Sequence, residues 1–265
     1  MATGGMYRKE KDGVTFYQFP VFSGFENLRH AVFTREGGHS TGPFHSLNAS
    51  LGVGDDAASV RKNRWVMSKC LCVEADALVF ARQNHGSHVL TDIATDMELD
   101  SAGFRVVGTG DAMVMDAKGK YLTVQVADCQ SVILYDTIRE VVANVHSGWR
   151  GSIANIIGRT IDVMVQKFNC APQDIAAGVS PSLGPCCAEF IHYRTEIPKK
   201  LWRYKDARHH FDFWTLSYDQ LREKGVLSDN ISISSVCTKC HQDLFFSYRG
   251  KRLTGRFATV IGMTV

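Results

Sequence analysis

Three short segments of the chain each carry one side chain that could bind a metal ion. They read QNHG from residue 83, ADCQ from residue 127 and HSGWRG from residue 146. Two imidazoles and one thiolate form a ligand set that suits zinc, and a fourth position left open is typical of a catalytic zinc site. Such a zinc lowers the pKa of its bound water from 15.7 to roughly 7. The pattern therefore predicts His85, Cys129 and His146 as metal ligands and catalytic residues.

The spacing of these residues leaves other interpretations open. His85 and Cys129 are 44 residues apart, Cys129 and His146 are 17 apart, and no compact ligand motif such as HExxH occurs. Cys129 could instead be a small buried hydrophobic residue, with hydrogen-bonded histidines elsewhere. It could also be the nucleophile of a cysteine hydrolase, with His85 or His146 as the base.

Two charged residues next to these ligands could take part in the chemistry. Asp128 precedes Cys129 and could shuttle a proton, or it could orient a ligand or close a turn. Arg150 lies four residues after His146, near the start of a helix that we expect over residues 153–168. An arginine at a helix N-terminus is a candidate phosphate ligand.

A long loop rich in Gly, Ser and Asn is expected over residues 33–56, and long loops in compact domains are often functional. Arg35, Ser46 and Asn48 in this loop could add phosphate contacts. Ser and Asn also form local turn hydrogen bonds readily, so a purely structural role is the alternative.

The elements that must position these residues alternate irregularly between strand and helix. Short apolar runs predict strands over residues 77–82, 121–126, 132–135, 141–145, 231–236 and 257–261. Helices are expected over 56–70 with Asp55 or Asp56 as N-cap, over 153–168 with Ser147 or Ser152 as N-cap, and over 217–224. Without strict βαβ alternation, this order favours an α+β fold with mixed sheets covered by helices.

Composition narrows the class of protein. The 265 residues fit one large domain or two tightly fused halves, and the net charge of +3 gives no support for nucleic-acid binding. No secretory signal or run of 18 apolar residues is apparent, so we expect a cytoplasmic protein without a membrane partner. The eight cysteines are then expected as reduced thiols.

Several longer motifs, in order, resemble the YfiH-like family, whose other labels are laccase-domain protein, multicopper polyphenol oxidase and peptidoglycan editing factor. QNHG, ADC and HSGWRG match its three central elements, with Ser147 in place of the usual alanine. The other matching segments are TREGGHSTGPFHSLN, GDAMV, SPSLGPCCAEF, FDFWTLSYDQL and CTKCHQDLFFSYRGKRLTGRFATVIG. The resemblance runs from about residue 34 to residue 265.

The resemblance implies a single domain over 1–265, with mixed β-sheets packed as a sandwich and flanked by helices. It places His85, Cys129 and His146 on the family's zinc-binding and catalytic positions. It also implies deamination of adenosine and phosphorolysis of purine nucleosides, with nucleoside and phosphate as small-molecule partners. Copper-dependent polyphenol oxidation and the editing of peptidoglycan precursors by a cysteine or zinc hydrolase are the alternatives that the family's other labels suggest. A non-enzymatic protein that keeps the site as a relic is the fourth possibility.

The remaining cysteines give weaker signals. Cys237 and Cys240 form a CxxC pair, which could be a redox pair or half of a zinc site. Of these two cysteines, only Cys237 matches the family's C-T element, so Cys240 is interpreted as incidental. Cys186 and Cys187 fall on the family's G-P-C-C element and are expected to be structural, packed beneath the site.

Overall fold

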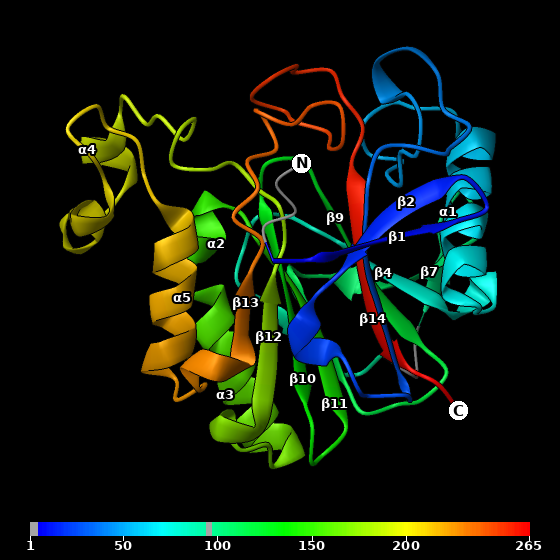
Figure 1. The fold of residues 1–265 in the computed structure, drawn as a ribbon, viewed down its shortest axis with the longest axis horizontal. Coiled ribbons are helices and arrows are strands. Elements are labelled where there is room, and N and C mark those ends of the chain that lie inside the picture. The colour runs from blue at the N-terminus through cyan, green and yellow to red at the C-terminus, as the bar shows by residue number, and fades with distance from the viewer. Residues whose placement is uncertain (1–4, 94–96) are drawn as a thin grey trace.

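Two β-sheets packed face to face form the centre of the molecule, with helices on both outer faces (Figure 1). The computed structural model describes residues 5–93 and 97–265. One sheet has the strand order β1-β2-β3-β14-β9-β4-β7-β6, and the other has the order β13-β12-β10-β11-β8-β5. Both sheets mix parallel and antiparallel pairs. The expected α+β class, with mixed sheets flanked by helices, is confirmed.

The strands are β1 (Tyr7–Lys11), β2 (Val14–Gln18), β3 (Leu28–Phe33), β4 (Leu78–Arg82), β5 (Val89–Leu90), β6 (Glu98–Leu99), β7 (Arg105–Thr109), β8 (Ala112–Met115), β9 (Tyr121–Val126), β10 (Gln130–Asp136), β11 (Val141–Ser147), β12 (Ile175–Val179), β13 (Ile231–Ile233) and β14 (Phe257–Met263). The α-helices are α1 (Ala57–Leu71), α2 (Trp149–Ile153), α3 (Ile156–Phe168), α4 (Tyr193–Glu196) and α5 (Phe213–Glu223).

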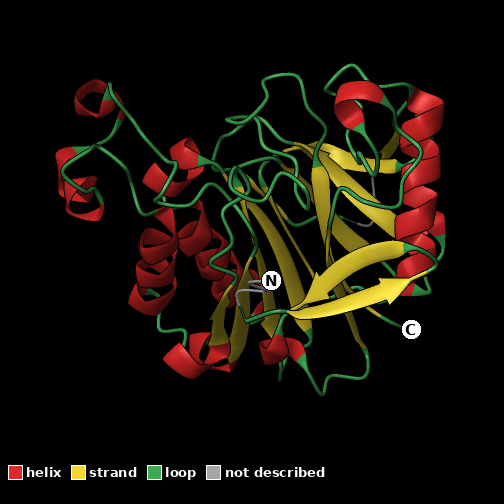
Figure 2. Cartoon of the chain, turned by 45° about the horizontal axis from the view of Figure 1, so that its top comes forward, coloured by secondary structure: helices red, strands yellow, loops and turns green. Residues whose placement is uncertain are grey.

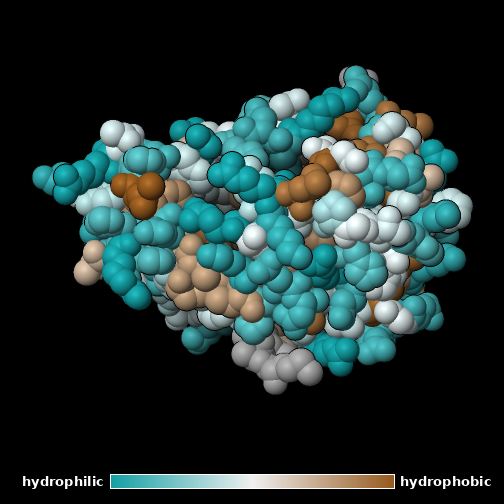
Figure 3. Space-filling view, turned by 90° about the horizontal axis from the view of Figure 1, so that it is seen from above, coloured by the Kyte–Doolittle hydropathy of each residue, from teal (hydrophilic) through white to brown (hydrophobic). Residues whose placement is uncertain are grey.

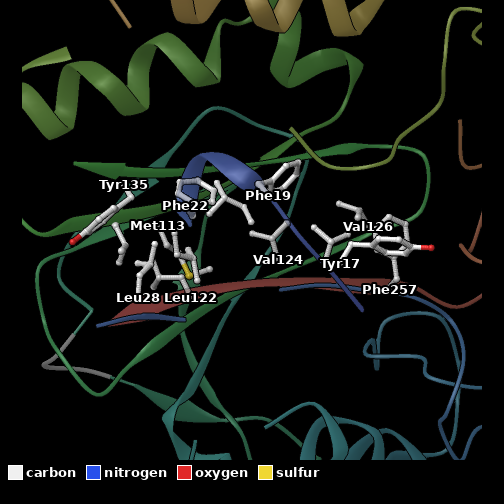
Figure 4. Close-up of a cluster of buried hydrophobic side chains, with 14 of the residues drawn as sticks. Tyr17, Phe19, Phe22, Leu28, Met113, Leu122, Val124, Val126, Tyr135 and Phe257 are labelled. Atoms are coloured by element: carbon white, nitrogen blue, oxygen red, sulfur yellow. The ribbon is translucent and has the colours of Figure 1, made fainter. Parts of the chain in front are cut away.

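The alternation of side chains along the central strands builds three apolar layers. In β10, Ile133 and Tyr135 point between the sheets, whereas Val132 and Leu134 face the helical layer of α3. In β9, Val124 contributes to the layer between the sheets, which Figure 4 shows together with its aromatic neighbours. Strands that are covered on both faces are expected to have continuous apolar runs. This explains why the sequence of β10 does not alternate between apolar and polar residues from Val132 to Tyr135.

A buried polar group joins the two sheets within this apolar layer. The Asn144 side chain in β11 donates to the carbonyls of Leu122 and Thr259 at 3.0 Å each, and accepts from Ser131 Oγ at 2.7 Å. Leu122 and Thr259 belong to the opposite sheet. Because a buried amide is costly unless it is paired, this group favours one register of sheet against sheet.

Three of the α-helices, α1, α3 and α5, begin after a residue whose side chain caps the helix. Asp56 caps α1 by accepting from the Ser59 amide, as expected. The helix expected over 153–168 is wrong at its start, because α2 ends at Ile153 and α3 begins at Ile156. Asn155 lies between them in the left-handed region with φ of 54° and caps α3 through the Gly158 amide. Neither Ser147 nor Ser152 is the cap of α3.

The long connections gather at one end of the sandwich. The loop after β3, the extension that carries α4 and the loop before β14 all reach the top of Figure 1, and Figure 2 shows this end tilted forward. Viewed directly, this end is mostly hydrophilic, with small separate apolar groups (Figure 3). The segments that follow β4 and β9 and the C-terminal end of β11 come together beneath these loops.

Within the residues that the structure describes, no helix has the length and apolar character needed to cross a membrane.

Candidate metal and nucleoside site

The three sequence-predicted ligands converge at this loop end. His85 follows β4, Cys129 lies in the turn between β9 and β10, and His146 is near the end of β11. One potential ligand atom from each lies within 4.8 Å of the others, and Cys129 Sγ is 3.8 Å from His85 Nε2. These three residues could therefore hold a metal ion.

Two of the residues that position this site have a left-handed backbone. His85 has a φ of 60° and Asp128 has a φ of 82°. Non-glycine residues adopt this region at a cost of order 1–3 kcal/mol, so it persists only where the surroundings impose it. At His85 the constraint is visible, because the His85 and Gly86 amides both donate to the Asp111 carboxylate at 2.9 and 2.7 Å.

Asp111 also orients the second histidine. Its Oδ1 is 2.7 Å from His146 Nδ1, and the Asp111 side chain has no solvent exposure. Because Nδ1 is hydrogen-bonded to Asp111, Nε2 is the nitrogen of the His146 ring that is available to bind a metal ion. A carboxylate that holds the far nitrogen of a ligand histidine is the usual outer support of a zinc site. Sequence reasoning did not assign Asp111 a role, although the GDAMV motif contains it.

The site favours the charged forms of its thiol and of its buried imidazole. Burial alone would raise the pKa of Cys129, but the charge and hydrogen bonds of His146 and His85 outweigh it, so the pKa is lowered. Burial opposes protonation of His146, yet the nearby Cys129 and Asp111 raise its pKa. The pKa of Asp111 is lowered despite burial, by its bonds to His146, Gly86 and His85. The pocket thus stabilises a thiolate, the form that binds metals.

Gly148 keeps space beside the ligands open. A Cβ atom at this position would lie 3.0 Å from Cys129 Sγ and 3.1 Å from His85 Cδ2. Any side chain here would therefore push against two ligands at once, which explains a glycine directly after the strand that carries His146.

A cavity of about 840 Å³ opens beside the three ligands. That volume is ample for a small-molecule ligand of nucleoside size. Its apolar wall includes five aromatic side chains, and its polar wall includes five arginines. The aromatic residues are Phe80, Trp149, Phe190, Phe213 and Tyr248, and the arginines are Arg64, Arg82, Arg150, Arg249 and Arg256.

The arginines differ in how free they are to meet a ligand. Arg64 is 2% exposed and paired with Asp100 at 2.5 Å, and Arg82 is paired with Glu98. Arg256 is half-buried, and burial lowers its pKa while the Cys129 and Asp128 charges act in the opposite direction. Arg249 and Arg256 each donate to backbone carbonyls, Arg249 to that of Glu189 and Arg256 to those of Thr254 and Gly255, but both line the cavity. They therefore join Arg150 as cationic groups that could meet an anion.

Arg150 lies on the cavity wall, but not at the start of a long helix. Its guanidinium stacks over the Trp149 ring, 4.2 Å from the centroid. The expectation that it sits at the head of a 153–168 helix is wrong, because α2 is a separate helix of five residues. A helix this short has a small dipole, so the guanidinium itself is what Arg150 offers an anion.

The loop residues proposed as phosphate contacts do not line this cavity. Arg35 donates to the carbonyls of His45 and Gln242 and covers the Phe246 ring. Ser46 donates to the Arg35 carbonyl. Asn48 is fully buried and accepts from the Arg256 backbone amide at 2.8 Å. The contacts of all three hold the loop, and those of Asn48 also position Arg256.

Asp128 lies on the cavity wall with its carboxylate already bonded. It accepts from Thr238 Oγ1 at 2.6 Å, from Ser247 Oγ at 2.7 Å and from the Arg249 amide at 2.5 Å. These bonds tie the turn that carries Cys129 to the loop before β14.

The sequence matches a known protein family and several curated proteins. Residues 29–264 match the family described as "Multi-copper polyphenol oxidoreductase laccase". A Bacteroides thetaiotaomicron protein named "Purine nucleoside phosphorylase" is 29% identical, over 87% of this chain and 89% of its own length. The Geobacillus stearothermophilus "Purine nucleoside phosphorylase YlmD" is 31% identical, over 86% of this chain and 88% of its own length.

Solved structures share the fold. The Bacillus licheniformis hypothetical protein YfiH superposes with a TM-score of 0.86 at 26% identity, covering 97% of this chain and 98% of that one. YlmD from Geobacillus stearothermophilus superposes with a TM-score of 0.85 at 29% identity, covering 98% and 99%. With its fold, its His-Cys-His group and its matched sequence, the chain belongs to the laccase-like YfiH family.

Proposed function

We propose that this protein is a zinc-dependent purine nucleoside enzyme that catalyses phosphorolysis of purine nucleosides, including methylthioadenosine, and deamination of adenosine. The observation that carries this proposal is the convergence of His85, Cys129 and His146 on the wall of a cavity with aromatic and guanidinium groups. The names of the curated relatives support the nucleoside and phosphate part of the proposal.

The donor set fits zinc. Two neutral imidazole nitrogens and a thiolate are borderline and soft ligands of the kind that zinc accepts, and three protein ligands leave a fourth position for water or substrate. Asp111 fixes the His146 ring so that Nδ1 is occupied and Nε2 is available. When bound, zinc would supply a Lewis acid that activates water or polarises an oxygen or nitrogen of the substrate.

Phosphate binding falls to the arginines of the cavity. We assign it to Arg150, Arg249 and Arg256, because guanidinium groups bind phosphate through paired hydrogen bonds. Arg35, Ser46 and Asn48 are assigned the role of holding the loop, since they do not line the cavity and their polar atoms bond to other parts of the loop and its surroundings.

The purine base would pack on the aromatic wall. Trp149 and Phe190 lie edge to face with ring centroids 5.9 Å apart, and Phe190 packs similarly against Phe213. Such rings offer a flat apolar surface to a base. In phosphorolysis a phosphate oxygen bonds to the ribose anomeric carbon as the bond to the purine nitrogen breaks, and the base leaves with a proton. In deamination, water adds to the carbon that bears the amine, and ammonia leaves.

Asp128 is assigned as a positioning residue in this scheme. Its three hydrogen bonds fix the turn that presents Cys129.

The test is a turnover assay on zinc-loaded protein. Inosine with inorganic phosphate should give hypoxanthine and ribose 1-phosphate, and adenosine should give inosine without phosphate. Cys129→Ala should lower both rates by more than about 100-fold, because it removes a metal ligand. Cys72→Ser, an exposed thiol elsewhere, is the matched control and should retain activity. Intact nucleosides after prolonged incubation of the zinc-loaded protein would sink the proposal.

A cysteine hydrolase is the second candidate, and one observation favours it. Cys129 Sγ lies 3.8 Å from His85 Nε2, as in a thiol–imidazole pair. The two candidates separate on metal removal, because a hydrolase would form a covalent Cys129 adduct with its substrate after chelation. Copper-dependent phenol oxidation ranks lower, because a multicopper site needs many histidines. Among the described residues, one potential metal-ligand group contains histidine, and that group has two histidines.

A further inference from the structure

A second group of four potential metal ligands lies outside the site described above. Cys186, Cys187, Cys237 and Cys240 offer sulfur atoms that all lie within 4.8 Å of one another. The Sγ atom of Cys240 is 3.6 Å from those of both Cys186 and Cys187. The two pairs come from segments about 50 residues apart in sequence, so the fold and not chain proximity gathers them.

The sulfur spacing matches one tetrahedral ion. Zinc–sulfur bonds of about 2.3 Å in tetrahedral geometry place neighbouring sulfurs ~3.8 Å apart. A disulfide needs about 2.05 Å between sulfurs, and all eight thiols of the chain are free. A multi-iron cluster places iron and sulfide between its thiolates, which needs more room than these sulfurs leave.

The surroundings support a shared ion as well. Cys237 is buried, and its sulfur accepts from the Gly184 amide at 3.3 Å, a bond suited to a thiolate. A Cβ at Gly184 would lie 3.0 Å from Cys237 Cβ, so the backbone approaches closely here. Four-cysteine sites with a closed ligand shell are typical of structural zinc.

We propose that Cys186, Cys187, Cys237 and Cys240 bind a second, structural zinc ion, separate from the His-Cys-His group. The ion joins the segment after β12 to the loop before β14.

Both joined segments reach the first site. The Leu183 amide donates to the Asp128 carbonyl at 2.9 Å, and Thr238 donates to the Asp128 carboxylate. The same two segments contribute Leu183 and Arg249 to the cavity wall. A zinc ion that fixes them therefore stabilises one rim of the cavity without touching the substrate.

The first test measures metal content after loading with zinc chloride and removal of excess. The wild type should hold about two zinc ions per chain, and Cys129→Ala and Cys240→Ser about one each. The exposed-thiol variant Cys72→Ser is the control and should keep both. A wild type with one zinc that Cys129→Ala removes entirely would overturn the proposal, as would full zinc content in Cys240→Ser.

A second measurement covers the case in which Cys240→Ser does not fold. X-ray absorption at the zinc edge on Cys129→Ala should show four sulfur neighbours at about 2.3 Å. Nitrogen or oxygen neighbours would overturn the assignment, and so would a disulfide between two of these cysteines, identified by peptide mapping of the unreduced protein. None of these readouts depends on turnover, so the failure of the proposed activity would leave this site standing.

Discussion

At the scale of single residues, the ligand histidines depend on one carboxylate. Asp111 accepts from His146 and from the backbone amides of His85 and Gly86, so it fixes the His146 ring and the backbone that carries His85. Asp111 contributes by fixing the position of the ligands, because it contacts His146 at Nδ1 and His85 at its backbone amide. Ligand orientation and ligand identity are therefore separable in this site.

Replacing Asp111 with Asn should separate them. Asp111→Asn keeps the size of the side chain but removes the charge that favours one His146 tautomer, and loss of such partners costs 10–100-fold in metal affinity or activity. Competition with a zinc chelator should show the weaker binding. Asp76→Asn, whose side chain is 69% exposed, is the control. Unchanged zinc affinity in Asp111→Asn would contradict the orienting role.

Gly148 gives a steric test of the same site. Gly148→Ala has no backbone conflict, because φ is −72°, but its Cβ would contact Cys129 Sγ and His85. We expect zinc occupancy to fall with little loss of folding stability. Gly52→Ala, at another wall of the cavity, meets its nearest neighbour at an ordinary 3.8 Å and should keep full occupancy. Equal zinc occupancy in the two variants would show that Cys129 and His85 can move to accommodate the added methyl group, and it would contradict the steric prediction.

At the scale of elements, β3 carries a histidine that the function does not use. His30 is 5% exposed, and its Nε2 accepts from the Phe19 amide at 2.9 Å. Burial lowers the pKa of His30 to about 3, so the folded protein keeps this ring neutral. The neutral ring anchors the segment between β2 and β3 to the sheet.

The pKa of His30 predicts acid sensitivity. Below pH ~6.5 the unfolded chain binds a proton at His30 that the folded chain does not, so the free energy of unfolding falls as pH falls. The slope from this residue approaches ~1.4 kcal/mol per pH unit and continues to about pH 3. Urea unfolding at pH 7 and pH 5 checks it. His30→Gln should be less stable than the wild type at pH 7, with a shallower decline; parallel declines would refute the assignment.

At the scale of the whole molecule, the two sheets share one apolar layer. That layer includes Val124 from one sheet and Ile133 from the other, and the buried Asn144 bonds across it. Neither sheet can therefore expose its inner face without exposing that of its partner. We infer that the chain unfolds as one domain.

A single unfolding transition is the expected result. Tryptophan fluorescence reports on both helical layers, and circular dichroism reports on the sheets. The four tryptophans are Trp65 on α1, Trp149 on α2, Trp214 on α5 and Trp202 in the 3-10 helix Lys199–Tyr204. The two signals should change together in urea. Phe257→Ala in the shared layer should lower the free energy of unfolding measured by both signals by about 3–5 kcal/mol. Separate midpoints would show two folding units.

Most of the local structure and the three potential metal ligands, His85, Cys129 and His146, could be predicted from the sequence. Apolar runs and caps such as Asp56 predict the strands and α1 because they act over a few residues. Motifs in order pointed to the family. The break between α2 and α3 escaped prediction, since apolar periodicity continues through Asn155 while its left-handed backbone ends the helical path.

Which residues from distant parts of the chain share a site depends on the tertiary fold. Asp111 meets His85 and His146, Arg249 and Arg256 reach the cavity, and the Cys237–Cys240 pair meets Cys186 and Cys187, although nothing in the sequence spacing links these distant partners. Sheet order and loop paths set such contacts, because they depend on the packing of both sheets at once. The sequence supplies the chemical groups, and the sandwich determines which of them meet.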